Sequence, residues 1–232
     1  MGREISIGST STAVLLAYTS GFVDTLSFIA LFGLFAAHIT GNFVLIATSL
    51  AEMHHGLWMK LLAVPVFIAA AVATRLFIIR HERNQRDATK HVLIAQAILL
   101  AAFMTVALAS QPFERGDQPL AILTGLLAAA AMAIQNAASR TFFSVLPPTT
   151  VMTRNLIQII VDTVDLAQGH EPLDAKRARL AKLVPMLLAF IAGTLCGAIG
   201  YTIAGFLSLV VPILTIGALA SFTKSSPQQV HA

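Results

Sequence analysis

The stretch His38-Ile39-Thr40-Gly41-Asn42 interrupts an apolar run that extends from Thr12 to Met53. A helix surrounded by lipid favours Leu or Val at such positions, whereas this stretch supplies a His, a Thr, a Gly and an Asn. A related stretch, Thr153-Arg154-Asn155, also lies between two apolar segments. The chain therefore has two polar breaks at predicted membrane depth, which we name the first break (residues 38–42) and the second break (residues 153–155).

A polar residue precedes each break at nearly the same distance. Asp24 lies 18 residues before Asn42, and Asn136, which follows Gln135, lies 19 residues before Asn155. Because the two spacings agree to within one residue, we interpret the chain as a duplicated unit that carries one polar break in each copy.

The duplication also divides the chain into domains. The apolar pattern of residues 67–73 returns in residues 190–196. Between the copies, residues 111–118 contain a Pro, a Gly and three charged side chains, which is typical of a water-exposed turn. We predict one integrated membrane domain made of a first repeat, a second repeat and a polar tail, at residues 1–110, 119–222 and 223–232.

The composition is that of a membrane protein. The 232 residues are 56% hydrophobic and 11% charged, with a mean hydropathy of +0.79. Soluble domains carry about 25% charged residues. The net charge of +4 does not indicate nucleic-acid binding, because the basic residues lie mostly in short loops, where they set topology. The sequence has no zinc motif, Walker loop, nucleophile elbow or Cys-x-x-Cys pair, so we predict no metal and no cofactor.

Six apolar segments have the length of spanning helices, at residues 12–34, 57–80, 91–110, 119–146, 183–204 and 206–222. Two shorter ones cover residues 40–53 and 150–165. A helix of about 14 residues is about 21 Å long, less than a hydrocarbon core of about 30 Å. We predict that Thr40 caps the first short helix, that Pro147-Pro148 turns the chain before the second, and that residues 166–182 form a charged linker.

The short helices either cross the membrane, giving eight spans and parallel repeats, or re-enter, giving six spans and inverted repeats. With six spans, ten Lys and Arg residues share the cytoplasmic side with both termini, and only Lys60 and Arg115 lie outside. Eight spans would separate the basic linkers 80–90 and 166–182, which the positive-inside rule disfavours. We predict an all-α polytopic membrane protein of two inverted repeats, each with three spanning helices and one re-entrant helix.

Two polar stripes follow the predicted helices. They consist of Ser20, Gly21, Asp24 and Ser27 in the first helix, and of Gln135, Asn136, Ser139 and Arg140 in the fifth helical segment. An ionisable residue this deep costs roughly 2.5–3.5 kcal/mol on insertion scales, so we predict that Asp24 has a protein partner, with Arg140 and Arg154 as the candidates, or lies in a water-filled cavity. The stripes form either two walls of a polar cavity or a buried hydrogen-bond network that locks the helices together.

Each break is a candidate binding site, because a buried helix N-terminus presents unpaired N–H groups and a partial positive charge. We expect Gly41 and Arg154 to lie within about 20 Å of each other near the bilayer midplane. In the alternative interpretation, the Thr residues only cap helices and the Asn residues anchor loops. The candidate site residues are Asp24, His38, Thr40, Gly41, Asn42, Gln135, Asn136, Arg140, Thr153, Arg154 and Asn155.

These pieces together resemble the YoaK-like family of bacterial inner-membrane proteins, a domain of unknown function. The matching pieces are Gly21-Phe22-Val23-Asp24 with Phe28, residues 35–42, Gln135-Asn136-Ala137 with Arg140, and Thr149-Thr150 before Thr153. The likeness covers nearly the whole chain. It implies a multi-pass protein of the bacterial inner membrane and supplies no substrate.

Three functions fit these features. The first is a small secondary transporter or channel for a polar or anionic solute bound between the breaks. The second is a structural or regulatory membrane subunit. The third, a membrane enzyme with Asp24 and His38 as acid and base, is disfavoured because no nucleophile or metal set accompanies them. The predicted partners are the lipid bilayer and the solute, with no nucleic acid, and a homo-oligomer is left open.

Overall fold

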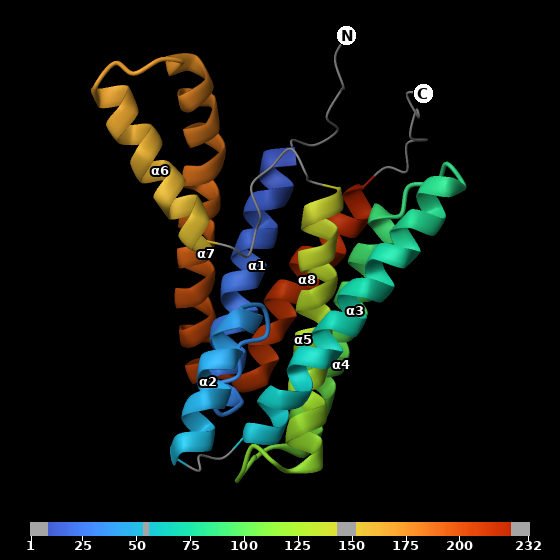
Figure 1. Ribbon diagram of the computed structural model, residues 1–232. Helices are drawn as coiled ribbons and strands as arrows, with labels where there is room; N and C mark the ends of the chain where they lie inside the picture. Colours follow the sequence, from blue (N-terminus) through green and yellow to red (C-terminus); the bar gives the residue numbers. More distant parts are fainter. Residues whose placement is uncertain (1–8, 53–55, 143–151, 224–232) are drawn as a thin grey trace.

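The computed structural model describes residues 9–52, 56–142 and 152–223, which are helical with no strand among them (Figure 1). The elements follow the chain in this order: α1 (Ser9–Ala30), α2 (Ile39–Glu52), α3 (Leu57–Arg83), α4 (Thr89–Ser110), α5 (Pro119–Thr141), α6 (Met152–Ala167), α7 (Leu173–Ala204), the short 3-10 helix η1 (Gly205–Leu209) and α8 (Val210–Phe222).

Five helical stretches are long and apolar enough to cross a membrane: Thr10–Ala30, Leu57–Arg83, Thr89–Ser110, Pro119–Thr141 and Leu173–Phe222. The last contains 50 residues, about 75 Å if straight, which exceeds any bilayer. The chain instead reverses at η1, where Gly205 adopts φ 57°, so that α7 and α8 run in opposite directions (Figure 1). Large apolar side chains such as Leu188, Leu195 and Ile203 are exposed on α7 and face the bilayer.

The helix boundaries differ most from the prediction around α7, while α1 ends at Ala30 rather than at residue 34 and α8 begins at Val210 rather than at residue 206. Residues 173–182, expected as a linker, instead form the first turns of α7. The stretch Leu173 to Lys182 consists largely of Ala, Leu, Lys and Arg, which are strong helix formers, and Asp174 lies favourably in the first turn. Charge therefore marks where α7 leaves the membrane and not where its helix begins. The predicted turn at Pro147-Pro148 lies outside the described residues.

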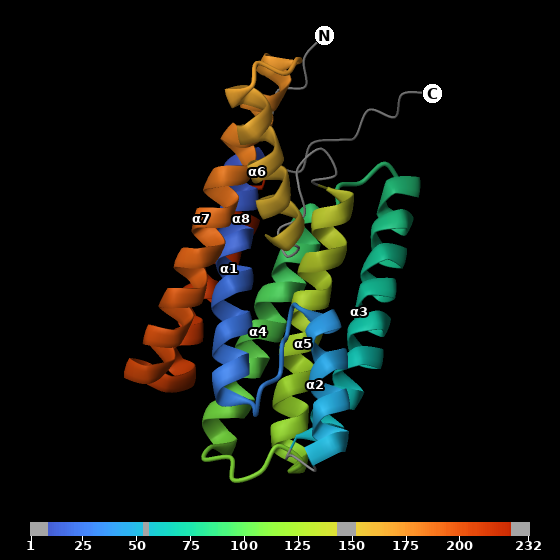
Figure 2. The same ribbon diagram turned by 60° about the vertical axis from the view of Figure 1, so that its left-hand side comes forward.

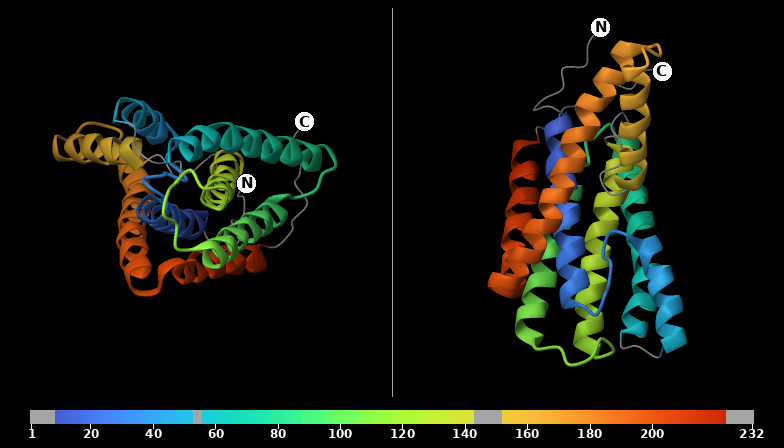
Figure 3. Two further views of the ribbon diagram at one scale, coloured as in Figure 1. Left: turned by 90° about the horizontal axis from the view of Figure 1, so that it is seen from below. Right: turned by 90° about the vertical axis from the view of Figure 1, so that its left-hand side faces the viewer.

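The two short helices run in opposite directions from the middle of the molecule. α2 begins at mid-height and extends to the lower end, whereas α6 begins at mid-height and extends to the upper end (Figures 1 and 3). The connections α3–α4 and α6–α7 lie at the upper end, and the α4–α5 connection and η1 lie at the lower end (Figure 1). Both basic segments are therefore at the same end of the bundle.

The closest helix contact joins α1 to α7. A Cβ atom on Gly193 would overlap the carbonyl oxygen of Tyr18, and one on Gly197 would overlap that of Phe22. From the other side, a Cβ atom on Gly21 would overlap the backbone of Phe190. Small residues four apart let two helix backbones touch, which drives association in lipid where burial of apolar surface does not.

The helices pack as two units, each of which combines the first helix of one repeat with the remaining three helices of the other repeat. α1 contacts α7 and α8, and α6 contacts α7, which gives a first unit of α1 with α6–α8. α5 contacts α3 and α4, and α2 contacts α3, which gives a second unit of α2–α5 (Figure 2). The units meet along α1–α5 and, more extensively, where α4 contacts α8 and η1; α8 packs more on α4 than on the α1 of its own unit. The first helix of each repeat therefore packs mainly against helices of the other repeat.

The α1–α7 contact predicts that even a methyl group at its centre destabilises the fold. We expect Gly193→Ala to lower the free energy of unfolding by about 1–3 kcal/mol, because the added carbon overpacks against a backbone that cannot move aside. Gly217→Ala on α8 is the matched control, because a Cβ there meets no atom within 4 Å. Denaturation of the detergent-solubilised protein measures both; equal stabilities of the two variants would contradict the contact.

Candidate functional site

The Asp24 carboxylate is held by the connection between α1 and α2 (residues 31–38). Its Oδ1 accepts a hydrogen bond from the Ala37 backbone N–H at 2.7 Å, and its Oδ2 lies 2.5 Å from His38 Nδ1. The predicted pair with Arg140 or Arg154 is therefore wrong: both of those side chains are exposed, and a backbone donor and an imidazole satisfy the carboxylate instead. Local donors can reach Asp24 because the non-helical connection folds back along α1.

Asn42 fixes the same connection from the other side. Its Oδ1 accepts the Phe35 N–H at 3.0 Å, and its Nδ2 donates to the Phe35 carbonyl at 2.7 Å, so one buried amide satisfies both backbone groups of one residue. Gly41 is required beside it, because a Cβ there would lie 2.8 Å from the Phe35 ring. The anchoring interpretation therefore holds for Asn42.

Thr40 does not cap α2. The helix begins one residue earlier, at Ile39, so Thr40 lies within the first turn with its side chain exposed. The His38 carbonyl accepts the Gly41 N–H at 2.9 Å, which places His38 at the residue before the helix. The sequence suggested Thr40 because Thr is a common N-cap, but the side chain of His38 is directed to Asp24 and not to the helix terminus.

A second polar cluster joins three helices. Gln135 Nε2 on α5 donates to the Leu16 carbonyl of α1 at 2.8 Å, and Gln135 Oε1 accepts from Gln96 Nε2 on α4 at 2.7 Å. Both glutamines are buried. Sequence reasoning missed Gln96, although it is the one amide within the apolar helix Thr89–Ser110 and so carried a signal.

The remaining members of the α5 stripe differ in their surroundings. Asn136 Nδ2 donates to the Met132 carbonyl at 3.0 Å, and Ser139 Oγ donates to the Asn136 carbonyl at 2.9 Å. Arg140 is exposed at the end of the stripe. Gln135 thus belongs to a buried network, whereas Arg140 is available to solvent or solute.

Two hydroxyl groups of α1 lie between these clusters. Thr19 Oγ1 and Ser20 Oγ are buried and form no hydrogen bond within the described residues. Ser20 lies one helical turn from both Leu16 and Asp24, so it is placed between the glutamine network and the carboxylate. An unsatisfied buried hydroxyl costs about 1–3 kcal/mol, and such groups are where water or a polar solute is expected to bind.

The first break contacts α7 through one aromatic side chain. The His38 ring lies edge-on to the Phe190 ring with centroids 5.8 Å apart. Phe190 also packs against the cluster that contains Met152, the first residue of α6. Phe190 therefore lies between His38, the first residue of the first break, and the apolar cluster to which Met152 belongs. Beside it, Thr153 and Arg154 are exposed, and Asn155 is buried 3.7 Å from the Met152 sulfur.

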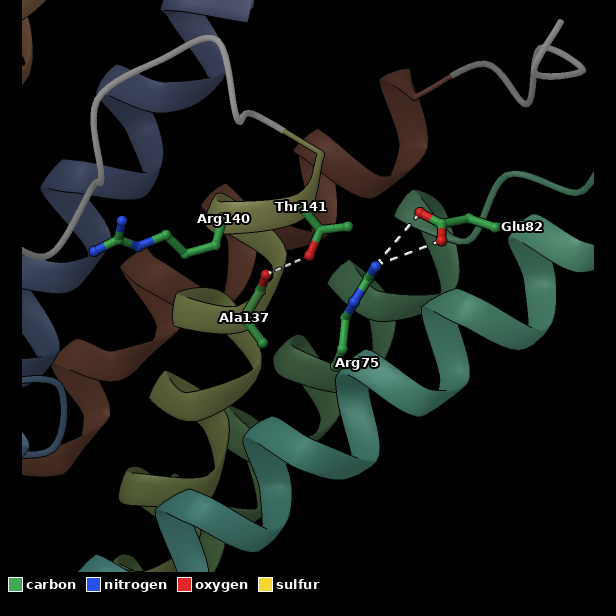
Figure 4. A pocket seen from close by; sticks show the side chains of 5 residues that line it. All are labelled: Arg75, Glu82, Ala137, Arg140 and Thr141. Atoms are coloured by element: carbon green, nitrogen blue, oxygen red, sulfur yellow. Dashed lines mark hydrogen bonds and ion pairs between the residues drawn. The ribbon is translucent and has the colours of Figure 1, made fainter. Parts of the chain in front are cut away.

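An open pocket of about 500 Å³ lies at the upper end between α3 and α5. Its lining residues are Arg75, Glu82, Ala137, Arg140 and Thr141 (Figure 4). Arg75 forms a 3.5 Å ion pair with Glu82, while the Arg140 side chain is directed away from both (Figure 4).

Ion pairs tie α6 to α7 near the upper end. Asp165 forms an ion pair with Lys176 at 2.9 Å. Asp162 is buried and accepts from Arg179 Nε and Nη2, both at 2.6 Å. The Arg179 guanidinium holds the pKa of the Asp162 carboxyl below its usual range. These pairs explain why α6 stays against α7. No cluster of three or more His, Cys, Asp or Glu suited to a metal occurs in the described residues.

Residues 12–222 match the family described as "Protein of unknown function (DUF1275)". The chain belongs to this family. It is also 27% identical over 149 residues to the UPF0700 transmembrane protein YoaK of Bacillus subtilis (strain 168), an alignment that covers 64% of each chain and thus less than two thirds of that relative. No solved structure matches the chain. This DUF1275 chain is therefore an integral membrane protein of an uncharacterised family, as the resemblance predicted.

The Asn42 anchor gives a direct test of the site in this DUF1275 chain. We expect Asn42→Ala to lower the free energy of unfolding by about 1–3 kcal/mol, because the Phe35 N–H and carbonyl lose their partner in a place with little water. Thr40→Ala, two residues away and exposed, should change stability by less than about 0.5 kcal/mol. Chemical denaturation measures both, and a neutral Asn42→Ala would contradict the anchor.

Proposed function

We propose that this chain is a small secondary transporter or channel for a polar or anionic solute, which binds between the two breaks. One observation carries the proposal: α2 and α6 both start at mid-height and run to opposite ends (Figures 1 and 3). Discontinuous helices that begin at the midplane are the usual substrate-binding elements of transporters with inverted repeats.

An inverted repeat is supported by the pattern of helix contacts. Exchanging α1–α4 for α5–α8 converts the α1–α7 contact into α5–α3, and α2–α3 into α6–α7. It converts α4–α5 into α8–α1, and leaves the pairs α1–α5 and α4–α8 unchanged. A pseudo-two-fold axis in the membrane plane produces this invariance, and it reverses the direction of the short helix, as between α2 and α6.

The two packing units supply a means of alternating access. Two sets of polar contacts lie where the units meet: Gln135 of the second unit bonds to the Leu16 carbonyl of the first, and Asp24 of the first unit holds the residues that lead into α2. A rocking motion of one unit against the other opens this junction to either side in turn. The buried, unpartnered Ser20 hydroxyl lies in the same region.

The charges favour an anion or the negative end of a polar solute. Arg154 is exposed in the first turn of α6, where the helix N-terminus adds a partial positive charge. Arg140 is exposed on the neighbouring end of the α5 stripe. The Asp24 carboxylate does not disfavour a bound anion, because His38 and the Ala37 N–H already compensate its negative charge.

The competing function is a structural or regulatory membrane subunit. The satisfied amides of Asn42, Gln96 and Gln135 favour it, since they lock helices without any solute. The unpartnered hydroxyls of Thr19 and Ser20 favour transport, because a purely structural interior has no reason to leave them unsatisfied. An enzyme is not proposed.

Solute binding is tested by thermal stability of the purified protein against a panel of inorganic anions, carboxylates and phosphorylated metabolites. We expect at least one anion to raise the melting temperature, since a ligand at about 100 times its Kd adds about 2.7 kcal/mol. Arg154→Gln should abolish the rise. Arg177→Gln, which removes the same charge from an exposed residue of α7, should retain it. No stabilising anion, or an unchanged response in Arg154→Gln, would contradict the proposal.

We further propose that the protein lies in the bacterial inner membrane with both termini and both basic connections in the cytoplasm. In a Cys196→Ala background, a cysteine at Gln85 should react with an impermeant reagent only after permeabilisation, because basic residues surround it. A cysteine at Glu114, which is exposed at the lower end, should react in intact cells. External labelling at Gln85 would reverse the orientation.

A further inference from the structure

The Asp24–His38 pair connects the protein interior to an accessible surface. The Asp24 side chain is 5% exposed, whereas the His38 side chain is 33% exposed, and their polar atoms lie 2.5 Å apart. Nδ1 of His38 faces the carboxylate, while Nε2 has no hydrogen-bond partner within the described residues. The imidazole can therefore exchange a proton through Nε2 while Nδ1 keeps its bond to Asp24.

The same pair joins the two packing units. Asp24 belongs to α1 in the first unit, and His38 immediately precedes α2 in the second unit. Asp24 also accepts the Ala37 N–H, so its charge holds both residues that lead into α2. Any change in the charge of the pair acts directly on the position of the first break.

Other ionisable groups near the pair do not bond to it. The rings that contact His38 are Phe35 of its own connection and Phe190 of α7, which carry no charge. On the α1–α7 contact, Tyr18 and Cys196 interact with each other. Lys60 of α3 lies near Gly33 and Gly56.

The arginines of α5 and α6, Arg140 and Arg154, are exposed and form no bond to Asp24 in the described residues. The only cation positioned to balance the Asp24 carboxylate is therefore, within the part of the chain described, a protonated His38.

We propose that Asp24 and His38 form a proton-binding site that latches the first break, and that proton release from it opens the break. In the loaded state, Nδ1–H of an imidazolium donates to the Asp24 carboxylate, and the pair is neutral overall. Loss of one proton from Nε2 leaves a net charge of −1 in apolar surroundings, which is costly without water. The break then loosens so that water reaches Asp24. The idea that this proton release is the coupling step of transport rests on the proposed function. Proton binding by the pair does not depend on it.

The direction of the pH dependence follows from the charges. A free imidazole is protonated below about pH 6.5, and a neighbouring carboxylate extends protonation to higher pH. The interaction between protonated His38 and Asp24 that latches the first break is therefore fully formed in acid. It weakens as pH rises through the titration midpoint of His38. Removing the carboxylate with Asp24→Asn should lower that midpoint.

The first measurement is a ¹⁵N NMR titration of histidine-labelled full-length protein in lipid nanodiscs. The chain has seven histidines, and His38→Gln identifies the signal that belongs to residue 38. We expect that signal to titrate through Nε2, with a midpoint that falls in Asp24→Asn. A His38 signal that does not titrate between about pH 5 and 9, or that titrates identically in Asp24→Asn, overturns the proposal.

The second measurement follows the break itself, in a Cys196→Ala background. Ala37→Cys places a thiol at a residue that is 7% exposed, and Thr40→Cys places one at an exposed residue nearby, which corrects for the intrinsic rise of thiol reactivity with pH. We expect the labelling rate at residue 37, relative to residue 40, to rise about tenfold as pH passes the His38 midpoint. A relative rate that stays constant overturns the latch.

Two variants keep the test decisive. Residue 38 cannot titrate in His38→Gln, so the relative labelling rate at residue 37 should not change with pH in that variant. The latch can therefore be tested even if Asp24→Asn fails to fold. Neither measurement uses a solute. A titrating latch in a protein that no anion stabilises would therefore refute the proposed function alone, whereas a stabilising anion without a titrating latch would refute the proton site alone.

Discussion

A carboxylate inside a membrane-spanning helix must be satisfied by the protein, and in this chain the Asp24 carboxylate determines the course of the first break. To supply its partners, residues 31–38 fold back along α1 until the Ala37 N–H and the His38 ring reach it. That return places the start of α2 at mid-height, and Asn42 then fixes the remaining backbone groups of Phe35. A short helix that begins at mid-height is the consequence of one buried charge.

The second constraint is the backbone contact between α1 and α7. Because glycines on both helices remove the space for side chains, α1 is committed to the second repeat and cannot pack within its own. The equivalent helix α5 packs on α3 in the same way. Exchanged first helices give a molecule of two units, whose junction contains the Gln135 bond to the Leu16 carbonyl and otherwise packs mostly apolar side chains, such as Phe103 on Phe206. The proposed transport would break and remake the few polar contacts at this junction through water.

Much of the fold was predictable, because long apolar runs with polar ends specify spanning helices and the charge count specifies which connections share an end. The partner of Asp24 was not, because sequence shows side chains of opposite charge but not the backbone N–H that a folded connection presents. The sequence could not show whether Gln135 lines a cavity or belongs to a buried network. Its bonds to Gln96 and to the Leu16 carbonyl decide for the network, and they depend on how α1, α4 and α5 pack together. The helical start of α7 was missed because its charges were interpreted as a linker, although helix propensity there is high.

The central claim is that the two breaks face each other at the middle of the bilayer. Pulsed electron–electron double resonance between spin labels at Thr40→Cys and Thr153→Cys, in a Cys196→Ala background, measures this directly. Both residues are exposed, and they lie in the first turns of the two short helices, α2 and α6. The account predicts one short distance near 20 Å, about two helix diameters, with both labels at equal membrane depth. A distance of about 30 Å or more, the thickness of the hydrocarbon core, with the labels at opposite faces would contradict it.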